Sequence, residues 1–143
     1  MPDFTKDVVS DILPFIESNY PVLTDSKGRA VAGFSVGGGQ TLNIGLTNTN
    51  KFAYVCAYAP FTATEEFRRH FTSWSVDSNR LNSELKLFSI SVGTEDFLYE
   101  PVKQNIAMFK EKGLNVKSYI VPGGHTWMNC KQYLATTLQE IFK

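Results

Sequence analysis

The chain has 143 residues, 43% of them hydrophobic and 20% charged, which is enough for one core in a single domain over residues 1–143. Its 14 basic and 14 acidic residues cancel, and no basic stripe suggests a nucleic-acid partner. No apolar run approaches the roughly 20 residues of a membrane span, so no membrane partner is expected.

The apolar pattern predicts helices alternating with strands. An amphipathic helix is expected over about 4–19, where Pro14 bends it or marks a short first segment. The elements expected after it are a strand at 29–34, a helix at 36–48, strands at 52–58 and 85–92, a helix at 99–112, a strand at 116–121 and a helix at 127–142. Such alternation is typical of the α/β class, with a parallel sheet of about four strands and helices on both faces.

Residues 60–84 interrupt this alternation and are expected to be irregular. They carry four large aromatic residues without clear periodicity, namely Phe61, Phe67, Phe71 and Trp74. An irregular stretch of this length is uncommon without a role. It is either a lid or pocket wall near the active site, or a satellite core under a long loop.

Gly33-Phe34-Ser35-Val36-Gly37 joins a predicted strand to a predicted helix. In that setting Gly-x-Ser-x-Gly is typical of a nucleophile elbow, a tight turn that exposes a serine hydroxyl. Small residues are expected two positions on either side of Ser35, because a Cβ there would strike a neighbouring strand or helix. The helix N-terminus behind Ser35 would stabilise a developing negative charge.

A serine nucleophile needs a base, and the chain has only two histidines. His125 follows the strand expected at 116–121, in a loop with two glycines, and is the predicted base. A loop histidine bonded to a local carbonyl is the alternative. His70 lies in a basic stretch and is expected to be a solvated surface residue.

The acid of a Ser-Asp-His arrangement is expected between the serine and the histidine. Asp96 follows the strand predicted at 85–92 and is the preferred candidate, with Glu95 second. Asp77 has no strand before it and is expected at the surface. Because Ser35, Asp96 and His125 each follow a predicted strand, they should meet at the carboxyl edge of the sheet.

These motifs resemble those of the α/β-hydrolase esterases, in particular the feruloyl, acetyl-xylan and enterochelin-esterase-like group. The resemblance runs from about Phe4 to the end and covers the C-terminal half of such an enzyme. It implies hydrolysis of acyl esters of plant cell-wall polysaccharide, with Ser35 as nucleophile, Asp96 as acid and His125 as base. It also implies an oxyanion donor in the Val36 N–H, no cofactor, and a secreted or extracellular location.

Further expectations concern the pocket and the cysteines. Phe34 and Trp127 are expected to contact the substrate, although Trp127 could instead anchor the last helix in the core. Cys56 and Cys130 are expected to be free and buried rather than joined in a disulfide. No Cys/His cluster indicates a metal site.

The chain is short for this group, and residues 1–27 contain no His-Gly-Gly loop for a second oxyanion donor. Activity of this chain alone is therefore expected to be weak. Two alternatives remain: a serine peptidase of the prolyl-oligopeptidase type, which shares Gly-x-Ser-x-Gly-Gly, and a catalytically inert fragment or scaffold.

The same shortness predicts an open sheet edge along strand 29–34. Unpaired backbone groups near Val31, Ala32 and Phe34 would favour a two-fold homodimer that buries this edge or helix 4–19. In the alternative, helix 4–19 folds over the edge and the chain remains a monomer.

Overall fold

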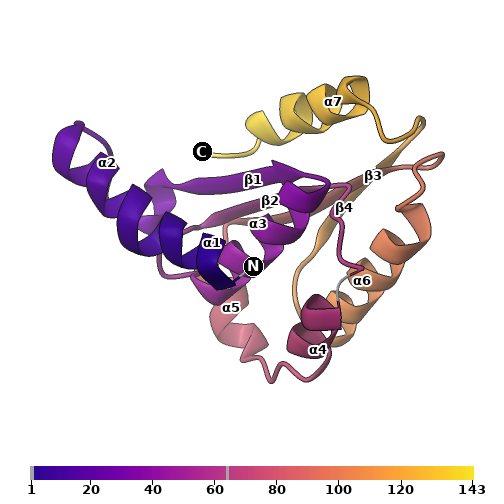
Figure 1. The fold of residues 1–143 in the computed structure, drawn as a ribbon, viewed down its shortest axis with the longest axis horizontal. Helices are drawn as coiled ribbons and strands as arrows, with labels where there is room; N and C mark the ends of the chain where they lie inside the picture. Colours follow the sequence, from indigo (N-terminus) through magenta and orange to yellow (C-terminus); the bar gives the residue numbers. More distant parts are fainter. Residues whose placement is uncertain (1, 64) are drawn as a thin grey trace.

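The computed structural model describes residues 2–63 and 65–143, and its centre is a parallel sheet of four strands (Figure 1). The strands are β1 (Ala30–Phe34), β2 (Tyr54–Tyr58), β3 (Leu87–Gly93) and β4 (Lys117–Val121), and they lie side by side in that order. Since all four strands are parallel, their carboxyl ends meet at one edge of the sheet. The predicted class and strand number are confirmed, with boundaries that differ by one or two residues.

Helices cover both faces of this sheet. They are α3 (Val36–Thr47), α4 (Glu65–Thr72), α5 (Ser78–Glu84), α6 (Tyr99–Glu111) and α7 (Trp127–Leu138). The larger core joins α3, α4, α5 and α6 to one face, where Val55, Ile90 and Val92 point. On the other face α7 packs with Tyr133 against Tyr54 and Tyr58 of β2. Figure 1 shows α7 on one side of the sheet and the other four helices on the opposite side.

The N-terminal helix consists of α1 (Pro2–Lys6), a π-helical segment η1 (Asp7–Ile12) and α2 (Leu13–Asn19). The π-helical segment ends two residues before Pro14, whose ring would clash with a carbonyl of the preceding turn in a regular α-helix. No side chain of η1 or α2 is buried. The helix is tied to α3 by Asn43, whose Nδ2 donates to Thr5 Oγ1 at 3.0 Å. Ala32, at the centre of β1, is exposed.

The expectation that residues 60–84 are irregular is wrong, because they contain α4 and α5. Phe67 and Phe71, one helical turn apart, are buried in the larger core, and Phe71 meets Phe109 of α6 edge-on with ring centroids 5.4 Å apart. Trp74 packs against the same core. The helices are only eight and seven residues long, too short for their periodicity to stand out in sequence. Of the two roles proposed for these aromatic residues, packing in the core is the one observed for Phe67, Phe71 and Trp74.

Both cysteines are free, as predicted. Cys56 is buried beneath α7, and burial raises the pKa of its thiol. Cys130 is half-buried, so the expectation that both are buried is wrong for this residue.

Candidate active site

Ser35 occupies a strained turn between β1 and α3. Its backbone has φ 59° and ψ −118°, a conformation that a residue with a Cβ rarely adopts. Its N–H donates to the carbonyl of Tyr58 at 2.9 Å, and its own carbonyl accepts from Phe61 N–H at 2.8 Å and Gly39 N–H at 3.1 Å. These bonds to the end of β2 and to α3 hold the serine in its strained conformation.

Glycines around Ser35 allow close approach, though not all where expected. A Cβ on Gly33 would overlap the carbonyl of Gly37, so the prediction of a small residue there is correct. A Cβ added to Gly37 would meet no neighbouring strand or helix within 4 Å, so the prediction is wrong at that position. The tight contacts instead involve Gly38 and Gly39, against the carbonyl groups and backbone that follow β2.

Asp96 and His125 form a hydrogen-bonded pair at the carboxyl ends of β3 and β4. The distance from His125 Nδ1 to Asp96 Oδ2 is 2.8 Å. The side chain of Asp96 is fully buried, and its Oδ1 accepts from Leu98 N–H at 2.8 Å. With the carboxylate accepting at Nδ1, the imidazole keeps its Nδ1 proton and Nε2 is free to accept another.

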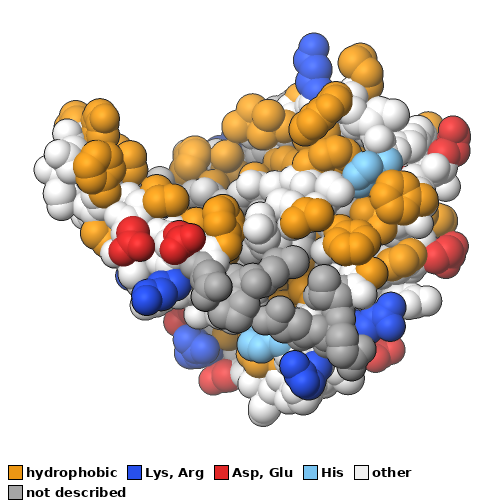
Figure 2. All heavy atoms as spheres, viewed as in Figure 1, with side chains coloured by type: hydrophobic (Ala, Val, Ile, Leu, Met, Phe, Trp, Pro, Cys, Tyr) orange, Lys and Arg blue, Asp and Glu red, His pale blue; other side chains and the backbone are white. Residues whose placement is uncertain are grey.

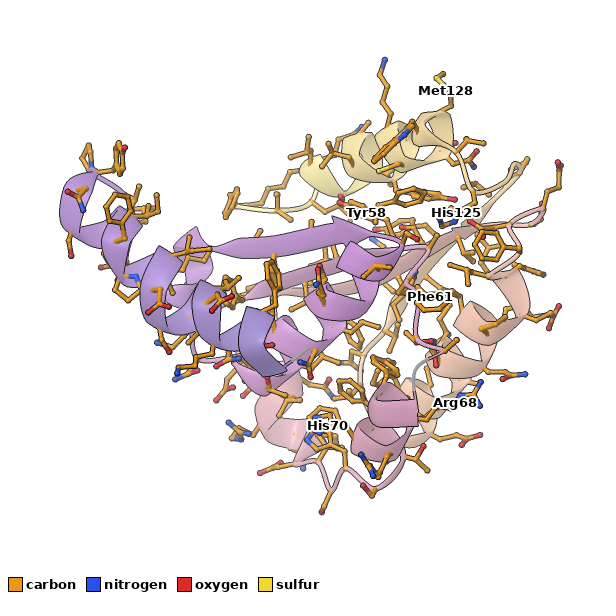
Figure 3. All side chains as sticks on the ribbon, in the orientation of Figure 1. Tyr58, Phe61, Arg68, His70, His125 and Met128 are labelled. Carbon is orange, nitrogen blue, oxygen red and sulfur yellow. The ribbon has the colours of Figure 1, made fainter. Side chains whose placement is uncertain are left out.

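The other predicted candidates lie elsewhere. Glu95, the second choice for the acid, is exposed, and Asp77 is the N-cap of α5, where it accepts from Arg80 N–H. His70 is exposed on α4. Figure 3 shows it at the opposite end of the molecule from His125. The structure therefore pairs His125 with Asp96 rather than with Glu95.

Aromatic rings surround His125. Phe34 stacks on the imidazole with centroids 4.5 Å apart and an angle of 22°, and Phe97 approaches it at 4.8 Å. Trp127 lies 5.4 Å from Phe34 and is 78% exposed, so it is not a core anchor of α7. Phe97 was not predicted, although its position directly after Asp96 was a usable signal. Figure 2 shows hydrophobic side chains clustered around the imidazole on this face.

The Ser35 turn is less enclosed than the Asp96 side chain. The imidazole lies over the ring of Phe34, the residue directly before Ser35. Among residues 2–63 and 65–143 the Ser35 hydroxyl makes no hydrogen bond. Val36 is the first residue of α3, so its N–H has no intrahelical partner, and its side chain is 50% exposed. This N–H is free to bind an anion next to the serine.

Two further features concern the part of the chain that the structure describes. No group of three or more His, Cys, Asp or Glu side chains there could hold a metal ion. Within the same residues, no helix has the length and apolar character needed to cross a membrane.

The parallel sheet, the strained serine turn and the Asp96–His125 pair at its carboxyl edge define an α/β-hydrolase fold. The chain belongs to the esterase family whose model is described as "Putative esterase", which matches residues 1–141.

Solved structures show the same fold. A ferulic acid esterase matches with a TM-score of 0.82 at 21% identity, over 93% of this chain and 58% of that one. The ferulic acid esterase of the anaerobic fungus Anaeromyces mucronatus gives 0.79 at 24% identity, over 97% and 53%. A fluorophosphonate-binding serine hydrolase of Staphylococcus aureus gives 0.76 at 18% identity, over 96% and 63%. The chain thus spans less than two thirds of these proteins, and at such identities the likeness establishes the fold alone.

Proposed function

We propose that this chain carries the catalytic residues of a serine carboxylic-ester hydrolase. The observation that carries the proposal is the 2.8 Å bond between buried Asp96 and His125, with the imidazole stacked beside the strained Ser35 turn. Membership of the esterase family supports the same reaction class.

In the proposed reaction, His125 Nε2 takes the proton of Ser35 Oγ as that oxygen attacks the ester carbonyl. Val36 N–H and a second donor bind the resulting oxyanion, and Asp96 stabilises the imidazolium. His125 then protonates the leaving alcohol, which leaves an acyl group on Ser35. Water, deprotonated by His125, attacks this acyl-enzyme, and His125 gives that proton to Ser35 Oγ as the acid is released, which restores the free serine.

We propose acyl esters of plant cell-wall polysaccharide, feruloyl or acetyl, as the substrates. Two of the structural neighbours are ferulic acid esterases, and the aromatic rings of Phe34, Phe97 and Trp127 beside His125 would suit a flat acyl group. Stacking on such rings favours an aromatic acyl group over acetyl.

A catalytically inert chain is the second candidate, and one observation favours it. The Ser35 hydroxyl is not bonded to His125, and Val36 N–H is the single oxyanion donor identified among the described residues. Loss of one oxyanion donor lowers turnover by roughly 10²–10³. We therefore expect hydrolysis by this chain alone to be slow.

The test is labelling with a fluorophosphonate probe, followed by assays on methyl ferulate, an aryl acetate and a proline-containing anilide. We expect Ser35→Ala to abolish labelling and turnover with little change in melting temperature, because it removes one half-exposed oxygen. Ser73→Ala, at an exposed position directly after α4, is the control for loss of a hydroxyl. Labelling that persists in Ser35→Ala would exclude this nucleophile, no labelling of the wild type would support the inert chain, and cleavage of the anilide alone would indicate a peptidase.

A further inference from the structure

The loop that carries His125 is hydrogen-bonded to a buried side chain that is not one of the proposed catalytic residues. Asn129, in the first turn of α7, is 8% exposed. Its Nδ2 donates to the carbonyl of Pro122 at 2.9 Å, and its Oδ1 accepts from the hydroxyl of Thr126 at 3.0 Å. Asn129 thus bonds to Pro122, which precedes His125 in the loop, and to Thr126, which follows it.

Thr126 completes a reciprocal arrangement. It is the N-cap of α7, and its Oγ1 accepts from Asn129 N–H at 3.2 Å while its hydroxyl proton goes to Asn129 Oδ1. The backbone N–H and the side-chain oxygen of Asn129 therefore both bond to Thr126, and they join the start of α7 to the end of the His125 loop.

The same side chain packs against the backbone that joins the histidine loop to the aspartate turn. Gly123 has φ 104°, and a Cβ there would lie 2.5 Å from Asn129 Oδ1 and 2.7 Å from its Nδ2. The carbonyl of Gly123 accepts from Glu95 N–H at 3.0 Å, and a Cβ on Gly93 would overlap that carbonyl. Glu95 directly precedes Asp96, so a shift of the Gly123 backbone would move both members of the Asp96–His125 pair.

We infer that Asn129 is a positioning residue that sets the Asp96–His125 geometry through Pro122, Gly123 and Thr126. This inference rests on the proposed function for its kinetic consequence but not for its structural one. Small displacements of a catalytic group cost up to roughly 10²-fold in rate. An apolar side chain at position 129 would also leave the Pro122 carbonyl without this donor.

The test uses proton NMR of the whole chain at low temperature. The imidazole Nδ1–H bonded to buried Asp96 should give a slowly exchanging downfield signal, absent in His125→Gln. His70 is exposed and should give none. We expect Asn129→Leu, and the near-isosteric Asn129→Asp that loses donation to Pro122, to broaden or abolish this signal. Where the wild type turns over an ester, kcat should fall about 10²-fold with KM within about twofold.

Asn82→Leu is the matched control. Asn82 also bonds to a glycine-containing loop through both ends of its amide, with Nδ2 donating to Gly113 carbonyl at 2.8 Å and Oδ1 accepting from the backbone N–H of Asn115 at 2.9 Å. It should lower the melting temperature without changing the downfield signal or kcat. A folded Asn129 variant that keeps the wild-type signal, or a wild type that has no such signal, would overturn the inference. A wild type with the signal but no turnover would refute the proposed function alone.

Discussion

The Asp96–His125 pair and the Ser35 turn lie at the same edge of the sheet, but the fold supports them differently. Asp96 follows β3, every residue of which is buried, and its own side chain is fully enclosed. His125 follows β4, an edge strand in which no residue is buried. Ser35 follows β1, the opposite edge strand, in which no residue is buried either. The acid half of the site is thus enclosed by tertiary packing, whereas the nucleophile half depends on a local turn held by bonds to β2 and α3. Variants of the two halves should differ accordingly.

The largest expected effect is on catalysis in the enclosed half. Asp96→Asn should lower turnover by about 10⁴, because an amide at this position favours the wrong tautomer of the imidazole. Glu95→Gln, next to it but exposed, is the control and should leave turnover within about twofold. Ester hydrolysis under single-turnover conditions measures both. Should Glu95→Gln be the damaging change, the acid would have to be reassigned.

Substitutions in the enclosed core should reduce the free energy of unfolding far more than substitutions in the N-terminal helix beside the open edge. Phe109 is fully buried and meets Phe71 and Phe88, so Phe109→Ala should reduce the free energy of unfolding by about 3–5 kcal/mol. Phe15 is 59% exposed on α2, and Phe15→Ala should change the free energy of unfolding by less than about 0.5 kcal/mol. Urea unfolding gives both values. A comparable loss in Phe15→Ala would mean that α2 is covered in solution.

Two glycine substitutions sharpen the same contrast on a smaller scale. Gly93→Ala places a Cβ against the Gly123 carbonyl and should destabilise the chain by about 1–3 kcal/mol. Gly37→Ala meets no described atom within 4 Å, and should be neutral or stabilising by up to about 1 kcal/mol through the higher helix propensity of alanine. Thermal unfolding of the two variants decides this. A larger loss of stability in Gly37→Ala than in Gly93→Ala would show that the enclosed and open halves are wrongly assigned.

The smallest effect concerns assembly at the open edge. Ser35 N–H bonds to Tyr58 of β2, and backbone groups alternate along a strand, so those of Ala30, Ala32 and Phe34 face away from β2. A two-fold axis at Ala32 would pair Ala32 with its copy and Ala30 with Phe34 of the copy. We propose a homodimer of this kind, which would also bury part of the hydrophobic face seen in Figure 2.

Sedimentation at micromolar concentration should therefore give twice the 16.1 kDa mass of the chain. Ala32→Lys, which charges the exposed centre of the edge strand, should give the monomer. Ala135→Lys, at another exposed alanine, on α7, should leave the dimer intact. A wild type that remains monomeric and binds no hydrophobic dye would contradict the proposal.

Sequence alone predicted the α/β class, the four strands and the position of each candidate catalytic residue directly after a strand. These features are local: strand and helix periods, and the glycines around Ser35, are written in neighbouring residues. Sequence could rank Asp96 above Glu95 but not decide between them, since both follow the same strand. The choice depends on which carboxylate turns inward to His125.

Tertiary structure decided what depends on residues distant in the chain. Residues 60–84 form two short helices because Phe67 and Phe71 are buried against α6 and the sheet, which outweighs a weak local pattern. Trp127 is exposed, and Phe97 reaches His125, because of how the loops after β3 and β4 approach each other. The role inferred for Asn129 likewise arises only where α7 meets the turn after β4, since its partners there become neighbours only on folding.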